Sequence, residues 1–204
     1  MTGIPTIADF RSRPLLPINA RGQGVSGWFA AWGLVLTEAA LFVYLLFSYA
    51  YSGLYAPGAW PPGGPPELRL AAPNTLILLA SSVALWWGER GIRRGRVRPL
   101  LIGGSAAFVL GAVFAGVQLL EWHNKPFTYA TSLYSALFFT VTGFHLAHVV
   151  VGLAVLAMLV LWGGLGYFDA TRHAAVSIGA LYWHFVDAVW LVVFATLYLT
   201  PYLR

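Results

Sequence analysis

The sequence predicts an all-α, polytopic membrane protein, a bundle of five transmembrane helices with its N-terminus inside and its C-terminus outside. Composition is the first reason, because 59% of the 204 residues are hydrophobic and only 9% are charged, with a mean hydropathy of +0.72. A soluble domain carries about 25% charged residues, so this chain has too few to cover a water-facing surface. The second reason is that the apolar residues gather into five runs, each near or above the roughly 20 residues that span a bilayer. A lone strand would leave its backbone unsatisfied in lipid, so all five runs are expected to be helices.

Each expected helix is bounded by a change in composition. The first carries Glu38 as its only charge, and the stretch APGAWPPGGPPELRLAAP after it is too dense in proline for a helix. The second is the shortest and gives way to GERGIRRGRVRP, which contains five Arg; the third ends at Glu121, and the fourth has no formal charge. The expected helices cover about 25–51, 72–88, 99–121, 133–162 and 174–200, in one transmembrane domain, 25–204, after a cytoplasmic arm, 1–24. Prolines in that arm and the length of the first run favour a retained helix over a cleaved signal.

The orientation follows from the basic residues of the loops. Nine Arg fall on the side of the N-terminal arm, and only Arg69, Lys125 and Arg204 fall on the other. Basic residues are enriched in cytoplasmic loops, which places the N-terminus inside. Their position in short loops also argues against a nucleic-acid-binding face, and the absence of cysteine excludes disulfides and Cys-ligated metals.

Small residues recur at every fourth position of two neighbouring runs. The third run has Gly103, Ala107, Gly111 and Ala115, and the second has Ala80, Ala84 and Gly88. This spacing lets two membrane helices approach each other closely.

The ionisable side chains inside the expected helices are the candidate functional residues: Glu38, Glu121, His145, His148, His184 and Asp187. At about 1.5 Å per residue, Glu38, His145 and His184 could meet near the midplane of the bilayer. Glu121 lies at the outer end of its helix, where solvent or a headgroup could reach it. Such groups are costly in lipid and need a reason to be there.

Three reasons are compatible with these residues. His145 and His148, like His184 and Asp187, share a helix face at a spacing of three, which could build a metal site, although the repeated Glu-x-x-His motif of di-iron bundles is missing. A proton or substrate pathway would need a longer chain of polar steps than the sequence offers. Hydrogen bonds between helices, which specify packing, are favoured by the residues alone.

Several segments of the chain resemble subunit III of the haem–copper oxidases, the cytochrome c and quinol oxidases, in its five-helix form. The segments occur in the family's order and are LTEAALF (36–42), GAWPP (58–62), PNTLILLASS (73–82), QLLEWHNKPFT (118–128), SLYSALFFTVTGFHLAHVVVG (132–152) and YWHFVDAVWL (182–191). Two positions depart from the family pattern. Leu146 replaces the glycine that follows the first motif histidine, and Ala136 replaces the glycine of the family's Tyr-Gly-Ser motif.

The resemblance implies an accessory, non-catalytic subunit of a proton-pumping oxidase complex in a bacterial plasma membrane. The haems and copper then belong to partner subunits, with subunit I as the main contact and subunit II in the same complex, and this chain carries neither. Cytochrome c or quinol donates electrons to the complex. Phospholipid binding is implied as well, as are support of proton uptake by Glu38 and an interhelical polar cluster of Glu121, His145, His148, His184 and Asp187.

Two alternatives stay open from the sequence. A homologous subunit accompanies some nitric oxide reductases, and a chain of this kind could instead be a small di-metal membrane enzyme.

Overall fold

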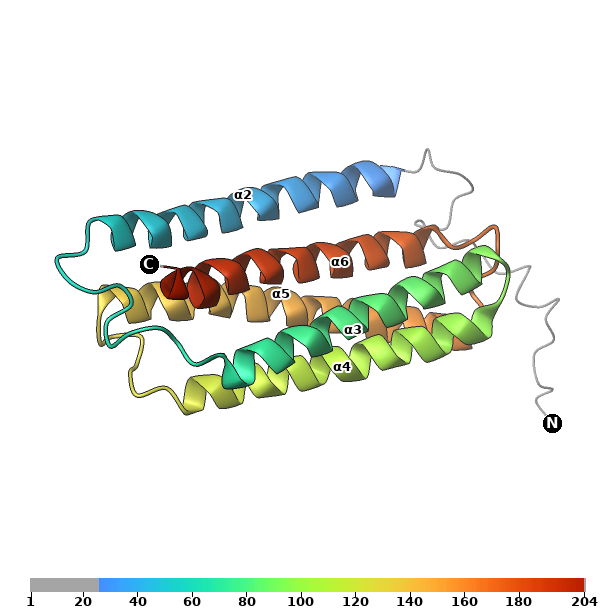
Figure 1. Ribbon diagram of the computed structural model, residues 1–204. Coiled ribbons are helices and arrows are strands. Elements are labelled where there is room, and N and C mark those ends of the chain that lie inside the picture. The colour runs from blue at the N-terminus through green and yellow to red at the C-terminus, as the bar shows by residue number, and fades with distance from the viewer. Residues whose placement is uncertain (1–25, 204) are drawn as a thin grey trace.

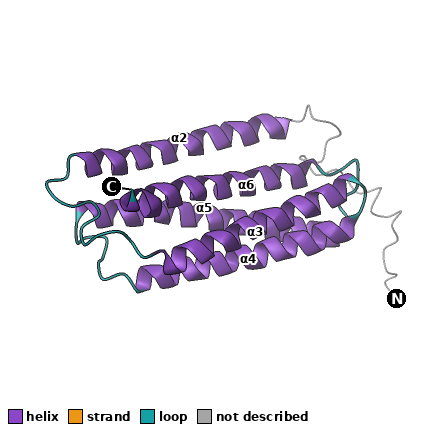
Figure 2. Cartoon of the chain, in the orientation of Figure 1, coloured by secondary structure: helices purple, strands orange, loops and turns teal. Residues whose placement is uncertain are grey.

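The computed structural model describes residues 26–203, and this part of the chain contains helices and no strand (Figure 1, Figure 2). The five long helices are α2 (Ser26–Leu54), α3 (Leu68–Arg93), α4 (Val97–His123), α5 (Leu133–Gly164) and α6 (Ala174–Phe194). All five are long and apolar enough to cross a membrane, which confirms the predicted fold class. The side of the membrane that each end faces stays a prediction, and the expected arm, 1–24, lies outside the described residues.

The helix α3 extends beyond the expected 72–88 at both ends. The stretch ending in ELRLAAP was expected to be non-helical, but α3 begins within it at Leu68 and includes Pro73. Only residues 68–72 precede this proline in the helix, so the backbone hydrogen bond that it cannot donate affects only the helix start. At the other end, Glu89 pairs with Arg93 at 2.6 Å, one turn later, and the charged sequence stays helical until Arg93.

The remaining four helices begin and end close to the expected positions. α6 continues beyond Phe194 as a π-helical turn, η2 (Ala195–Leu199), and a 3-10 turn, η3 (Thr200–Tyr202). The connection between α3 and α4 is a tight turn in which Gly95 has a φ of +75°, a backbone conformation that glycine adopts without strain.

The helices α3 and α4 form a closely packed hairpin, side by side along their length (Figure 1). A Cβ atom on Gly103 of α4 would overlap the carbonyl oxygen of Ala84 and the backbone of Gly88, both in α3. The close approach that the small residues predict is therefore confirmed at this crossing.

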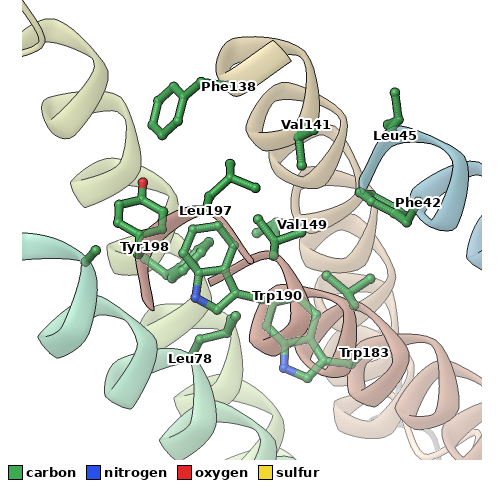
Figure 3. Close-up of a cluster of buried hydrophobic side chains, with 14 of the residues drawn as sticks. Phe42, Leu45, Leu78, Phe138, Val141, Val149, Trp183, Trp190, Leu197 and Tyr198 are labelled. Carbon is green, nitrogen blue, oxygen red and sulfur yellow. The ribbon is translucent and has the colours of Figure 1, made fainter. Parts of the chain in front are cut away.

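Tryptophan side chains of α6 fill the centre of the bundle, where Trp183 and Trp190 lie with Leu78 of α3 and Val149 of α5 (Figure 3). Both indoles are buried, and both nitrogens have a partner in α3. Trp183 Nε1 donates to Ser81 Oγ and Trp190 Nε1 to Thr75 Oγ1, each at 3.0 Å. The indole nitrogens are thus satisfied inside an apolar core, and α6 is fixed to α3 at two levels.

The helix α2 lies at the edge of the bundle and packs mainly against α5 and α6 (Figure 1). Much of its surface is exposed and apolar; Phe29 and Phe47, for example, are 81% and 63% exposed. In a membrane this surface faces lipid or another protein, and few contacts hold α2 in place.

Candidate functional site

Glu38 of α2 is paired with His148 of α5 across the interface between these helices. Its Oε2 lies 2.9 Å from Nε2 of His148, and the two side chains are 28% and 14% exposed. Phe42, one turn after Glu38, places its ring edge-on to the imidazole with the centroids 5.2 Å apart. The only charged residue of α2, Glu38, is thus paired with His148 in the middle part of an apolar helix.

The second nitrogen of His148 restricts where the proton of this pair can lie. Nδ1 is 2.6 Å from the carbonyl oxygen of Phe144, which can only accept, so Nδ1 must carry hydrogen. A hydrogen bond at Nε2 then joins either a neutral imidazole to a protonated Glu38 or an imidazolium to a carboxylate. Both forms have zero net charge and differ only in the position of one proton, which limits the cost of placing the pair in lipid.

His145 does not join this pair, although it lies one turn from His148. Its ring is fully buried between Phe114 of α4 and Trp190 of α6, with centroid distances of 5.9 and 4.9 Å. Neither ring nitrogen has a hydrogen-bond partner among the described residues. The expected meeting of Glu38, His145 and His184 near the midplane is therefore replaced by a contact of Glu38 with His148.

His184 and Asp187 connect α6 to α3 through Ser82. The Nδ1 atom of His184 lies 3.1 Å from Ser82 Oγ. Asp187 is only 6% exposed and its side chain also interacts with Ser82. One serine of α3 therefore contacts both members of the pair that the sequence places on one face of α6.

Glu121 lies near the end of α4, where the sequence predicts that solvent or a headgroup can reach it. In the structure its side chain is buried instead. It is 5% exposed, and its Oε1 accepts a hydrogen bond from the Tyr198 hydroxyl at 2.8 Å. Lys125 Nζ lies 2.9 Å from the same oxygen. The reason is that η2, which continues α6, places Tyr198 over the carboxylate in the last turn of α4.

These side chains do not form the single interhelical cluster expected from the sequence. Their polar contacts are distributed over separate places, between α2 and α5, between α3 and α6, and between α4 and η2. Within residues 26–203, no group of three or more His, Cys, Asp or Glu side chains could hold a metal ion. The sequence analysis did not predict the partners Ser82, Lys125 and Tyr198. Of these, only Lys125 could have been predicted, because it follows Glu121 by four residues, a spacing that favours an ion pair.

An apolar cavity of about 510 Å³ opens between α2, α5 and α6. It is lined in α2 by small and aliphatic residues, and its lining also includes Trp162 of α5 and Tyr182 of α6. Tyr182 also reaches the carbonyl oxygen of His148 with its hydroxyl, at 3.4 Å. Tyr182 therefore connects the lining of this apolar cavity to the backbone of His148.

Comparison with known proteins gives a consistent result. A family profile described as cytochrome c oxidase subunit III matches residues 27–202. Cytochrome c oxidase subunit 3 of Synechocystis sp. is 37% identical over 190 residues, which cover 90% of this chain and 81% of that protein. The proteins of the same name from Scyliorhinus canicula and Danio rerio are 34% and 35% identical, covering 80% and 82% of this chain and 66% and 68% of their own lengths. The chain thus spans about two thirds of the length of these two relatives.

Proposed function

The chain belongs to the cytochrome c oxidase subunit III family, and from this premise we propose that it is the accessory subunit III of a terminal respiratory oxidase. The complex would reduce oxygen to water with electrons from cytochrome c or quinol and would pump protons across a bacterial plasma membrane. The observation that carries the proposal is the family match over residues 27–202, which includes all five helices.

The chain would not perform the redox chemistry itself. Its partners would be subunit I, as the main contact, and subunit II, which would hold the haems and copper. The large apolar side chains exposed along α2, such as Phe29 and Phe47, offer a surface for lipid or for such a partner. The nitric oxide reductase and di-metal enzyme alternatives are not favoured, because the relatives described above carry the name of the oxidase subunit.

The Glu38–His148 pair would support sustained proton uptake by the complex. Moving one proton between Oε2 and Nε2 leaves the net charge of the pair unchanged, so the pair can hold a proton in either position without creating a lone charge in lipid. His148 would act as a positioning residue for Glu38. The contacts of Glu121, His184 and Asp187 would hold the helices in register, and His145 would fill the core between them.

A phospholipid acyl chain would occupy the cavity between α2, α5 and α6. Its volume of about 510 Å³ and its apolar lining suit a hydrocarbon chain. A chain there would also fill the gap beside α2, the helix with the fewest contacts to the rest of the bundle.

The proposal is tested by purifying the protein through an affinity tag in mild detergent. We expect oxidase subunits to co-purify and the preparation to show a haem absorption spectrum. The purified complex should consume oxygen with cytochrome c or quinol as donor. A haem-free preparation in which this chain carries stoichiometric iron would instead support the di-metal enzyme, and nitric oxide reduction without oxygen consumption would support the reductase subunit.

A further inference from the structure

The end of the α3–α4 hairpin contains a basic pocket that none of the contacts above explains. Its volume is about 190 Å³, and we call it the hairpin pocket. The residues that line it are Trp86, Trp87, Arg90, Gly91, Arg94, Arg96 and Pro99. It lies at the opposite end of the hairpin from Glu121, on the side predicted to be cytoplasmic.

The arginines of the hairpin pocket are not neutralised by carboxylates of the described chain. Glu89, the nearest acidic residue in sequence, pairs with Arg93, which is outside the lining. Within residues 26–203, no ion pair joins Arg90, Arg94 or Arg96 to an acidic side chain. Three exposed cations therefore surround one small cavity, and their mutual repulsion favours a bound anion.

The two tryptophans that line the pocket favour a lipid headgroup over a soluble anion as its ligand. The guanidinium carbon of Arg90 lies 4.2 Å above the ring of Trp86, so that Arg90 extends along an aromatic face. Trp86 and Trp87 are each 47% exposed, in the last two turns of a membrane-spanning helix. Tryptophan at this depth marks the boundary between headgroups and hydrocarbon, where one ligand can be charged at one end and apolar at the other.

We propose that the hairpin pocket binds the phosphate of an anionic phospholipid. Arg94 and Arg96 contact the phosphate from the turn, and Arg90 contacts it from α3. The acyl chains descend along Trp86 and Trp87. This site is separate from the apolar cavity beside α2, and it does not depend on the proposed oxidase function.

The test labels the full chain, in the membrane complex from which it is purified, with a photoactivatable phosphatidylglycerol in lipid nanodiscs. A phosphatidylcholine probe with the same reactive group serves as the reference. Crosslinked peptides are identified by mass spectrometry. We expect the phosphatidylglycerol probe to label the segment 86–99 more strongly than the phosphatidylcholine probe by about fivefold or more, because each surface arginine favours an anionic lipid by roughly that factor.

Arginine substitutions separate a defined site from a general attraction to a basic loop. Arg94→Gln and Arg96→Gln should each reduce phosphatidylglycerol labelling about fivefold. Arg98→Gln is the matched control, since it removes the same charge from an exposed position in the first turn of α4, four residues after Arg94, but Arg98 does not line the pocket. Arg94→Lys, which keeps the charge, should retain more labelling than Arg94→Gln and serves as the second variant if the Gln variants do not assemble, as judged by size-exclusion chromatography.

Three results would overturn the inference. Equal labelling by the two lipid probes would mean that the pocket does not select an anionic headgroup. An equal loss in Arg98→Gln and Arg94→Gln would mean that the arginines act only as a diffuse charge that sets topology. Displacement of the probe by excess inorganic phosphate would assign the pocket to a soluble anion.

Discussion

Gly111 of α4 and Trp183 of α6 are in such close contact that a Cβ atom on Gly111 would lie 2.5 Å from the indole ring. Gly152 of α5 approaches the same ring from another helix, where a Cβ atom would lie 2.7 Å away. The two glycines therefore create the space that Trp183, one of the two buried tryptophans of the core, occupies, and Ser81 Oγ accepts the hydrogen bond of its indole nitrogen.

Gly111→Ala should destabilise the protein by about 1–3 kcal/mol, because the added methyl group forces the buried indole of Trp183 out of its position. The measurement is the midpoint of heat-induced dissociation of this chain from its complex. Gly116→Ala on the same helix is the control, since a Cβ atom there meets nothing within 4 Å. It should be neutral or slightly stabilising, because alanine favours the helix by about 1 kcal/mol. Equal effects of the two substitutions would show that Trp183 does not depend on Gly111.

Asp169, in the loop between α5 and α6, should make stability depend on pH. Burial raises the pKa of its carboxyl, but hydrogen bonds from Thr171 and Arg172 outweigh this effect and hold the pKa well below its usual range. Its Oδ2 accepts from Arg172 Nε at 2.8 Å. A carboxylate with a lowered pKa stabilises the fold fully above its unfolded pKa of about 3.9, and this stabilisation declines as the pH falls from there toward the folded pKa.

Asp169→Asn is the variant that isolates this effect, because the amide oxygen can still accept the hydrogen bonds from the loop backbone. Wild type should be more stable than the variant from about pH 7 to about pH 5, and the difference should shrink as the pH is lowered below about 4. Thermal denaturation of the two proteins across this range measures it. A difference that stays constant with pH would show that the charge of Asp169 is not what stabilises the loop.

Glu38→Gln and Glu38→Ala should separate the positional role of Glu38 from its proposed proton role. An amide N–H of Gln can donate to Nε2 of His148 and keep α2 tied to α5, whereas Ala leaves that nitrogen unpaired. Both variants should keep their haem content and initial turnover but lose activity sooner during continuous turnover. Only Glu38→Ala should also destabilise the complex, by about 1 kcal/mol.

The active lifetime of the Gln variant decides between these roles. A wild-type lifetime in Glu38→Gln would reduce the function of Glu38 to holding α2 in place. Loss of the first turnover in a fully assembled complex would contradict an accessory role altogether. Oxygen consumption followed to inactivation, with the haem spectrum as a measure of assembly, provides both readouts.

The helical architecture could be predicted because hydropathy and small-residue spacing are local signals. Five apolar runs gave five helices, and the spacing of Gly103 with Ala84 and Gly88 anticipated the closest helix crossing. The extent of α3 was harder to predict, because the ion pair of Glu89 with Arg93 prolongs a helix through sequence that hydropathy treats as a loop.

The polar contacts could be predicted only as candidates. Glu38 and His148 are 110 positions apart, and an error of three residues in the depth estimate, about 4.5 Å along the helix axis, separates a contact with His148 from one with His145. Tyr198 reaches Glu121 because η2 prolongs α6, which no local pattern of residues indicated. The rotation of a helix about its axis and its depth in the bundle are set by the packing of all the helices, so they cannot be predicted from the sequence of one helix.

Lys125→Met should destabilise the protein by about 3–5 kcal/mol, because it leaves the carboxylate of Glu121 buried without its counter-ion. The two side chains are 13% and 6% exposed and their charged atoms are 2.9 Å apart, so water cannot readily replace the lysine. Arg93→Met is the control: Arg93 also pairs with a glutamate four residues earlier, but its side chain is 54% exposed. Loss of such an exposed pair should cost about 1 kcal/mol or less.

The double variant Lys125→Met/Glu121→Gln should recover much of the stability lost in Lys125→Met. The amide of Gln can still accept from the Tyr198 hydroxyl, now 2.8 Å from Glu121 Oε1, and it carries no charge that needs a partner. Thermal denaturation of wild type, both single variants and the double variant forms a double-mutant cycle that yields the coupling energy of the pair. Additive effects of the two substitutions would mean that Lys125 and Glu121 stabilise this end of the bundle independently, each through its own contact with Tyr198 of η2.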